Sequence, residues 1–341
     1  MDNSTALIGM SGGVDSSVAA YLMLRQGYNC KGATMRLFEN TDEDARSVCD
    51  RLGIPFYVLD NREAFRQTVM EDFVRCYEAG LTPNPCIHCN RHIKFGLFLR
   101  QAQELGCDCI VTGHYARIRQ ENGRQLLCKA ADTAKDQSYF LYSLTQEQLA
   151  HARFPLGELT KAEVRQIAEE QGFLNARKHD SQDICFVPDG DYFAFLEGFT
   201  QKTYENGDFL DLNGNVVGKH HGAVGYTLGQ RKGLGLAMGA PVYVCGKDME
   251  KNTVTVGPNE ALFTKELVAK DWNWIAFPTL TAPLRCKAKA RSRMAEQSAT
   301  VYPMENGFAK VIFDEPQRAI TPGQAVVLYD GDTVLGGGTI A

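Results

Sequence analysis

Apolar runs alternate with amphipathic stretches along the first half of the chain. The apolar runs, which predict buried strands, lie at residues 6–10, 29–35, 56–59 and 109–112. The stretches with helical spacing of apolar positions lie at residues 18–24, 42–52, 63–78 and 161–171. Strands that alternate with helices of this length pair in parallel through right-handed crossovers. The pattern therefore predicts a doubly wound α/β sheet with ligands at the carboxyl ends of its strands.

From about Gly207 the helical spacing fades and short strands dominate. Asn213-Gly214 between apolar residues is a hairpin signal, and residues 242–245 and 253–256 form a second strand pair. Later strands over 309–313, 325–329 and 334–340, with turns at Asn306-Gly307 and Asp330-Gly331, predict a small closed β-barrel. We expect three domains: an α/β domain over 1–200, a β-rich middle domain over 201–262 and a C-terminal barrel over 263–341.

Composition narrows the class of protein. The 341 residues are 44% apolar and 23% charged, with no run near the roughly 18 apolar residues of a membrane span and no signal peptide expected. Eleven cysteines indicate a reducing cytoplasm, where a Cys-x-x-Cys pair favours metal or redox chemistry over a structural disulfide. The net charge of −5 gives no global sign of a nucleic-acid partner, so any such surface must be local.

The first candidate site is the glycine loop, Ser11-Gly12-Gly13-Val14-Asp15-Ser16-Ser17, between the first strand and first helix. Glycines let backbone N–H groups approach an anion at a helix N-terminus, and the serine hydroxyls add donors. Asp15 is placed to meet Mg²⁺ or to fix the loop. An ordinary capped turn is the alternative, but the whole string favours phosphate. The string lacks the Gly-Lys-Ser/Thr ending of a Walker A loop, and its glycine spacing does not fit the dinucleotide-binding fingerprint. It resembles the loop of the ATP-pyrophosphatase (PP-loop) superfamily, which adenylates a substrate oxygen.

Three more residues are expected at the same crevice because they follow strand ends. Met35 ends the second strand and fits either against an adenine ring or in a plain core. Gly113 lies where a nucleotide would pass, and His114 follows it. A structural role for His114 is as plausible as a functional one.

Two cysteines are candidate nucleophiles. Prolines at 83 and 85 predict a stiff exposed loop before a helix that begins near Arg91, which places Cys89 at a helix N-terminus. The dipole and nearby cations would favour its thiolate, a buried structural cysteine being the alternative. Cys185 follows a polar segment with basic residues at 177–179, which would favour its thiolate too.

In one stretch near the C-terminus, basic residues alternate with small residues. Its basic positions are Arg285, Lys287, Lys289, Arg291 and Arg293, and its small positions are Cys286, Ala288, Ala290 and Ser292. In a strand the two sets face opposite sides, so the small residues would pack in the barrel. The basic face suits a phosphate backbone or, equally, a solvated surface.

Nearly the whole chain resembles the bacterial tRNA-uridine 2-sulfurtransferase family. The matching strings are Gly9-Met10-Ser11-Gly12-Gly13-Val14-Asp15-Ser16, Thr82-Pro83-Asn84-Pro85, Cys89-Asn90, Thr112-Gly113-His114-Tyr115, Lys135-Asp136-Gln137-Ser138-Tyr139-Phe140, Asp180-Ser181-Gln182, Ile184-Cys185-Phe186, Gly229-Gln230-Arg231-Lys232-Gly233 and residues 316–324. The resemblance implies an enzyme that makes 2-thiouridine at the wobble position of the tRNAs for Lys, Glu and Gln.

The resemblance also implies residue roles. ATP with Mg²⁺ would be bound by Gly9, Met10, Ser11, Gly12, Gly13, Val14, Asp15, Ser16, Met35 and Gly113. Cys185 would carry a persulfide from a sulfur-relay protein, and Cys89 would be its partner thiol, brought to it by a mobile loop. Asn84, Pro85 and Cys86 would meet the target base. The tRNA would be contacted by His114, Lys135, Asp136, Gln137, Arg291, Ser292 and Gln324. A monomer is expected.

Position 86 departs from some relatives, which carry aspartate there. A general acid or base role for that aspartate would be lost in this chain. Cys86, Cys89 and Cys185 are instead three thiols that could hold an iron–sulfur cluster or zinc, which remains an alternative to persulfide chemistry. An amide-forming ATP pyrophosphatase and a tRNA-binding protein with a vestigial loop are the competing hypotheses.

Overall fold

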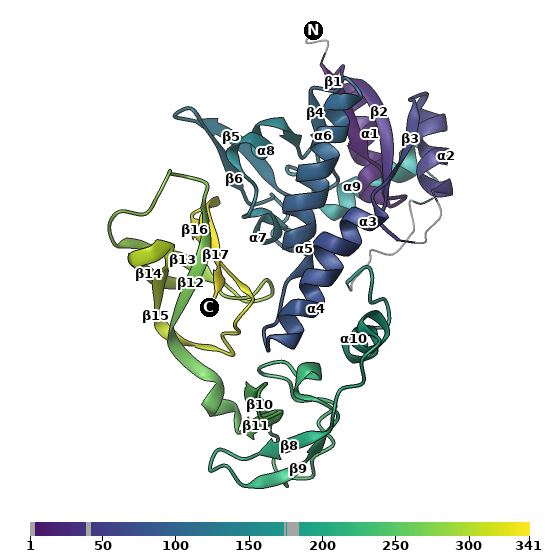
Figure 1. Cartoon of the computed structure of the whole chain (residues 1–341). Helices are drawn as coiled ribbons and strands as arrows, with labels where there is room; N and C mark the ends of the chain where they lie inside the picture. The colour runs from purple at the N-terminus through teal and green to yellow at the C-terminus, as the bar shows by residue number, and fades with distance from the viewer. Residues whose placement is uncertain (1–3, 39–41, 174, 176–183) are drawn as a thin grey trace.

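The computed structural model describes residues 4–38, 42–173, 175 and 184–341. Its first domain is built on a parallel sheet (Figure 1). The strands are β1 (Thr5–Gly9), β2 (Asn29–Arg36), β3 (Phe56–Asp60), β4 (Cys109–Val111) and β7 (Ala152–Arg153). Their order is β3-β2-β1-β4-β7, and every pairing is parallel. The predicted doubly wound sheet is confirmed. The order reverses between β1 and β4, which is where such sheets bind ligands.

Helices cover both faces of this sheet, so its central strand is apolar on both sides. Leu7 of β1 packs into one core, whereas Ala6 and Ile8 pack into the other, under α1 (Val14–Arg25), α2 (Glu43–Leu52) and α9 (Lys161–Glu170). A strand buried on both faces is expected to lack polar alternation, as this one does. None of the helices in the described ranges is long and apolar enough to cross a membrane.

Of two long helical segments, the second covers the other face, and the first packs against the second and against the helix at residues 192–200. The first comprises α3 (Arg62–Phe65), η1 (Arg66–Met70) and α4 (Glu71–Glu78), and the second comprises α5 (Pro85–His88), η2 (Cys89–Leu97) and α6 (Phe98–Glu104). The prediction that the second begins near Arg91 is wrong. Pro85 occupies the first helical turn, where proline loses no hydrogen bond, so both Cys86 and Cys89 lie within the helix. The shorter helices are α7 (Ser138–Leu141), α8 (Gln146–His151) and α10 (Tyr192–Thr200).

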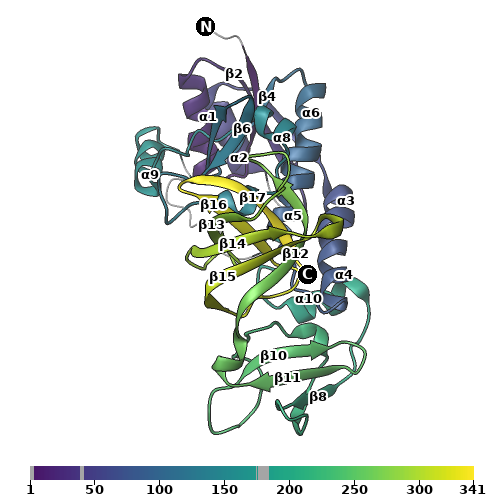
Figure 2. The same ribbon diagram turned by 90° about the vertical axis from the view of Figure 1, so that its left-hand side faces the viewer.

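The C-terminal strands close into a six-stranded barrel, which confirms the expectation (Figure 2). They are β12 (Phe263–Trp274), β13 (Leu284–Lys289), β14 (Gln297–Pro303), β15 (Ala309–Arg318), β16 (Ala325–Asp330) and β17 (Thr333–Ile340). Pairing of β12 with β17 completes the ring. Closure removes exposed sheet edges.

A hairpin of the first domain extends the sheet of the barrel. It consists of β5 (Arg117–Glu121) and β6 (Arg124–Cys128), and Cys128 pairs with Thr333 of β17. One apolar core then spans both domains, since Leu127 and Tyr139 pack in the same cluster as Ala325 and Tyr329. The Tyr139 hydroxyl also donates to the Ala325 carbonyl at 2.9 Å. The two domains therefore share a core.

The middle domain is a four-stranded sheet in the order β10-β11-β8-β9. Its strands are β8 (Gly207–Leu210), β9 (Val216–His220), β10 (Tyr243–Asp248) and β11 (Thr253–Gly257), and its 3₁₀ turns are η3 (Ala223–Gly225) and η4 (Asn259–Leu262). A further 3₁₀ turn, η5 (Glu305–Gly307), lies between β14 and β15 of the barrel. Gly214 has φ +85°, a value glycine adopts freely, in the turn predicted between β8 and β9. The β-rich middle domain is thus confirmed, and Figure 1 shows it at the far end from the N-terminus.

Candidate active site

The glycine loop is held in shape by its own side chains. The hydroxyls of Ser16 and Ser17 both donate to the Gly13 carbonyl at 3.0 Å, and the Ser11 N–H donates to Ser16 Oγ at 3.2 Å. Gly12 has φ +71°, which strains any other residue. Gly13 caps α1 without a side-chain hydrogen bond. The free N–H groups at the start of α1 therefore follow directly after a turn that hydrogen bonds hold in place. Such an arrangement binds phosphate.

Asp15 holds the loop to two distant elements. Its carboxylate accepts from the Tyr115 hydroxyl at 2.8 Å and from the Lys161 ammonium at 2.8 and 2.9 Å. Lys161 is the first residue of α9, whose start is fixed by a capping box between Thr160 and Glu163. Of the two roles expected for Asp15, fixing the loop is the one these contacts support.

A cavity of about 380 Å³ opens at the carboxyl ends of β1, β2 and β4. Its walls comprise Gly9, Met10, Ser11, Asp15, Ser16, Thr34, Met35, Leu37, Phe38, Lys94, Thr112, Gly113, His114, Gln137 and Cys185. Seven of the ten residues expected to bind ATP thus line one cavity together with Cys185, whereas Gly12, Gly13 and Val14 are not among its lining residues. Asp15 is the one carboxylate among these lining residues, so Mg²⁺ would reach the site mainly through the phosphates it accompanies.

Gly113 touches the glycine loop directly. A Cβ at this position would lie 2.8 Å from the Asp15 carbonyl carbon and 2.9 Å from the Ser16 nitrogen. Its neighbour His114 is 9% exposed and pairs through Nδ1 with the Thr112 hydroxyl at 2.8 Å. Burial lowers the pKa of His114 well below 6.5, so the ring stays neutral. His114 therefore packs in the wall without offering a positive charge.

Cys185 reaches the cavity because its neighbour is anchored. The Phe186 ring packs against Phe65, Phe73 and Phe195 with centroids 5.8, 5.2 and 5.1 Å away. Cys185 itself is exposed, but the surrounding walls desolvate its thiolate and raise the pKa of the thiol. The basic residues expected to activate it, 177–179, lie outside the described residues.

Cys89 differs from the expectation of an exposed thiolate. It is 7% exposed, and burial raises the pKa of its thiol to about 12. The error follows from the helix start: Cys89 lies one turn inside the helix, packed with Phe65, Val69 and Ile93. Lys94 is the shared cation, since its charge favours the thiolates of Cys86, Cys89 and Cys185 alike. Activation would therefore depend on Lys94 rather than on the helix dipole.

Most of the residues expected to contact tRNA have partners within the chain. Asp136 accepts from the Ala130 N–H at 2.9 Å and the Ser138 hydroxyl at 2.7 Å, and Gln137 accepts from the Tyr115 N–H at 2.9 Å. Lys135 lies half-buried just before them, and Ser292 lies half-buried in the turn after β13. These contacts shape the loop beside the cavity.

Gln324 connects the barrel to the segment expected to meet the base. Its side-chain amide donates to the carbonyls of Thr82 and Pro83 at 2.8 and 3.2 Å. Asn84 follows as the helix N-cap, Pro85 is buried and Cys86 is exposed. The barrel therefore sets the position of the turn that leads into the cysteine helix.

The basic stretch is only partly the cationic face that alternation predicts. Cys286, Ala288 and Ala290 do pack inside the barrel. Strand β13 ends at Lys289, however, and the charges are largely engaged. Arg285 pairs with both oxygens of Asp314, Lys287 donates to Ser298, half-buried Lys289 lies over Tyr139, and Arg291 donates to Leu228 O and Thr321 Oγ1. Burial lowers the pKa of Lys289. The expectation of one uniform positive face is wrong.

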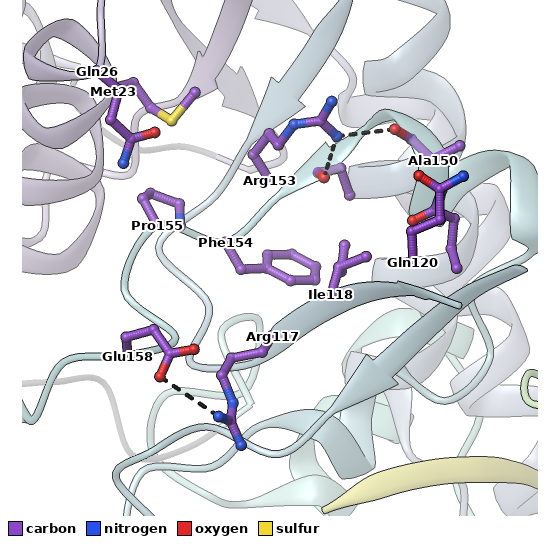
Figure 3. A pocket seen from close by; sticks show the side chains of 12 residues that line it. Met23, Gln26, Arg117, Ile118, Gln120, Ala150, Arg153, Phe154, Pro155 and Glu158 are labelled. Carbon is purple, nitrogen blue, oxygen red and sulfur yellow. Dashed lines mark hydrogen bonds and ion pairs between the residues drawn. The ribbon is translucent and has the colours of Figure 1, made fainter. Parts of the chain in front are cut away.

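A second cavity of about 440 Å³ lies between the end of α1, β7 and the β5–β6 hairpin (Figure 3). Its arginines are engaged by the protein: Arg117 pairs with Glu158 at 3.5 Å, and Arg153 donates to the carbonyls of Ala150 and Ala152, both at 2.9 Å. Its lining contains neither the glycine loop nor a cysteine. The cavity at the glycine loop is therefore the candidate active site.

Several site residues were missed by sequence reasoning. Tyr115 and Lys161 hold Asp15, and Asn175 donates to the Gly12 carbonyl at 3.0 Å. The Thr160-x-x-Glu163 capping box is visible in the sequence and predicts where α9 begins. Nothing local in the sequence indicated that this helix start lies against the glycine loop.

We expect Lys161→Met to raise the KM for ATP by about tenfold or more. The substitution leaves the Asp15 carboxylate without its counter-charge beside the phosphates, whereas Lys161→Arg keeps the charge. Steady-state AMP formation at varied ATP measures the effect. An unchanged KM in Lys161→Met would show that the Lys161–Asp15 contact does not support ATP binding.

The fold and the cavity define a class of protein. A parallel sheet whose central strand leads through a Ser-Gly-Gly-x-Asp-Ser loop into a helix is the architecture of the ATP pyrophosphatases of the PP-loop type. The sequence matches "tRNA methyl transferase HUP domain" over residues 4–189, "tRNA methyl transferase PRC-barrel domain" over 194–258 and "Aminomethyltransferase beta-barrel domain" over 264–340.

Similar sequences place the chain in one family of this class. The chain is 49% identical to the tRNA-specific 2-thiouridylase MnmA of Clostridioides difficile, covering 99% of this chain and 98% of that protein. It is 51% identical to that of Symbiobacterium thermophilum, covering 98% and 91%. The chain belongs to the tRNA-specific 2-thiouridylase family. Among solved structures, a 4-thiouridine synthetase–RNA complex with bound ATP aligns over 58% of this chain and 50% of that chain, with 18% identity and a TM-score of 0.36.

Proposed function

We propose that this chain is a tRNA-uridine 2-sulfurtransferase that adenylates the C2 oxygen of uridine and replaces it with sulfur. Membership of the family supports the reaction class. The observation that carries the proposal is that Cys185 lines the same cavity as the glycine loop. A sulfur carrier and an ATP-splitting loop at one cavity are what a thiolation through an adenylate requires.

The first half of the reaction uses the glycine loop. The phosphates of ATP would lie on the N–H groups of residues 11–17, with the adenine ring toward Met35, whose Cε lies 3.6 Å from the position of a Cβ on Gly9. The flipped uridine offers its C2 oxygen to the α-phosphorus, and pyrophosphate leaves. Preorganised N–H donors would stabilise the charge that develops on the phosphates. Mg²⁺, when bound, would neutralise phosphate charge there.

The second half uses the thiols. The outer sulfur of a Cys185 persulfide attacks C2, and AMP leaves with the former C2 oxygen. The Cys89 thiolate then attacks the Cys185 sulfur. This breaks the sulfur–sulfur bond, releases 2-thiouridine and leaves a Cys89–Cys185 disulfide that needs an external thiol reductant. In the alternative route, Cys89 attacks the persulfide first and frees hydrosulfide as the nucleophile.

An iron–sulfur cluster on Cys86, Cys89 and Cys185 is the alternative sulfur chemistry. In the part of the chain that the structure describes, no three His, Cys, Asp or Glu side chains are arranged to hold a metal ion. We therefore take the persulfide route as the proposal. Iron and sulfide analysis after anaerobic purification would reveal a cluster.

The proposed substrates are the wobble uridines of the tRNAs for Lys, Glu and Gln, with sulfur delivered by a relay protein to a monomer in the cytoplasm. The resemblance of the matched strings supports the tRNA substrates. All eleven cysteines are free thiols in the structure, which supports a reducing compartment.

The test is a reconstituted thiolation with purified chain, an unmodified tRNA-Lys transcript, ATP and inorganic polysulfide. We expect one AMP and one pyrophosphate for each 2-thiouridine formed, measured by nucleotide chromatography and nucleoside mass spectrometry. A transcript with cytidine at the wobble position is the matched control. Formation of ADP, or thiolation without ATP, would overturn the proposal.

A further inference from the structure

A third thiol lies beside the two that the proposed reaction uses. Cys86 and Cys89 are on one helix, three residues apart, and the Cys89 N–H donates to the carbonyls of Pro85 and Cys86. Cys86 is exposed, whereas Cys89 is buried. Cys185 is exposed at the cavity, and its neighbour Phe186 packs in the same apolar cluster as Cys89. The cysteine helix therefore carries one exposed and one buried thiol beside the segment that carries Cys185.

The geometry allows two of them to form a disulfide. Residues three apart on a helix have Cβ atoms about 5–6 Å apart, and a disulfide needs about 3.5–4.5 Å. The first turn must therefore tighten by roughly an ångström. Cys-x-x-Cys pairs at helix starts form such bonds in redox proteins. Cys86 and Cys89 occupy that position, directly after Pro85.

The burial of Cys89 creates a need for such a bond. A Cys89–Cys185 disulfide would keep the sulfur carrier tied to a buried side chain until an external reductant collides with its exposed Cys185 half. Cys86 is an exposed thiol one helical turn from Cys89. Unlike an external reductant, it is already present beside the bond. We propose that Cys86 is a resolving thiol, which attacks Cys89 in the Cys89–Cys185 disulfide and frees Cys185 for the next sulfur.

The exchange is balanced. The Cys86 thiolate forms a bond to the Cys89 sulfur, the Cys89–Cys185 bond breaks, and Cys185 leaves as thiolate. The number of disulfides is unchanged, and the Cys86–Cys89 bond, attacked at its exposed Cys86 half, then takes two electrons from the same external thiol reductant. Attack at Cys89 rather than Cys185 is favoured because the helix holds Cys86 within one turn of Cys89. Burial raises the pKa of the Cys86 thiol, and the charge of Lys94 opposes this effect.

The inference rests on the proposed sulfur transfer and is tested in a single turnover. Protein loaded with polysulfide is mixed with equimolar tRNA and ATP without reductant, quenched with acid and alkylated, and its disulfides are mapped by mass spectrometry. We expect the unaltered protein to end with a Cys86–Cys89 disulfide and an alkylated Cys185. The Cys86→Ser protein that has formed 2-thiouridine should instead end with a Cys89–Cys185 disulfide.

Repeated turnover gives the second readout. With a dithiol reductant present, the later turnovers of Cys86→Ser and Cys86→Asp should be about fivefold or more slower than the first turnover of the same variant, whereas Cys245→Ser in the middle domain should show no such difference. A Cys89–Cys185 disulfide as the end product of the unaltered protein would overturn the inference, as would full-speed turnover by both Cys86 variants. Absence of 2-thiouridine from the unaltered protein would instead overturn the proposed function.

Discussion

Serine in place of Cys185 is expected to lower persulfide-dependent thiolation by at least about 10³-fold, because the variant has no sulfur to transfer. Cys185 is the cysteine among the residues that line the cavity with the glycine loop. Adenylation uses other groups, so the variant should still bind ATP and tRNA. Transfer of labelled sulfur to tRNA under single-turnover conditions measures the loss.

Two comparisons separate the carrier role from a folding defect. Millimolar sulfide, supplied as a free nucleophile, should restore part of the activity to Cys185→Ser. Cys245→Ser, which alters another partly exposed thiol in β10, should behave as the unaltered protein. Persulfide-dependent activity retained by Cys185→Ser would remove this residue as the carrier.

Alanine at Gly113 is expected to raise the KM for ATP by about tenfold or more. Its Cβ would meet the backbone of Asp15 and Ser16 at 2.8–2.9 Å, so the glycine loop must move away from β4. The phosphate-binding N–H groups would move with it. Overpacking of this kind also costs about 1–3 kcal/mol of stability, which thermal unfolding would report.

The matched control is Gly198→Ala in α10, where a Cβ meets nothing within 4 Å. Alanine there should leave the KM unchanged and keep or raise stability, since it is the better helix former. Equal ATP kinetics in Gly113→Ala and the unaltered protein would show that the loop tolerates displacement.

The sequence was sufficient for the sheet because its signals are local. The glycine loop, the apolar strands and the turns at Asn213-Gly214 and Asp330-Gly331 each depend on adjacent residues, and all are present in the structure. Small residues alternating along 286–290 likewise predicted the barrel interior, and Cys286, Ala288 and Ala290 are buried there.

The remaining features depend on contacts between distant residues. The start of α9 meets the glycine loop through Lys161 and Asp15, 146 positions apart. Arg285 is neutralised by Asp314, which lies on another strand. The depth of Cys89 follows from a helix that begins at Pro85 and packs on Phe65 and Val69. Periodicity and composition carry no information on such pairings.

The pairing of Cys128 with Thr333 has a consequence for how this architecture can evolve. The barrel pairs with the edge of the hairpin, and Ala325 and Tyr329 pack over Leu127 and Tyr139. Exchange of either part for an unrelated module would therefore expose apolar surface on both. The nucleotide-splitting unit and its barrel would therefore have to be inherited together. The middle domain has its own apolar cluster and is the segment where length and surface can vary more freely.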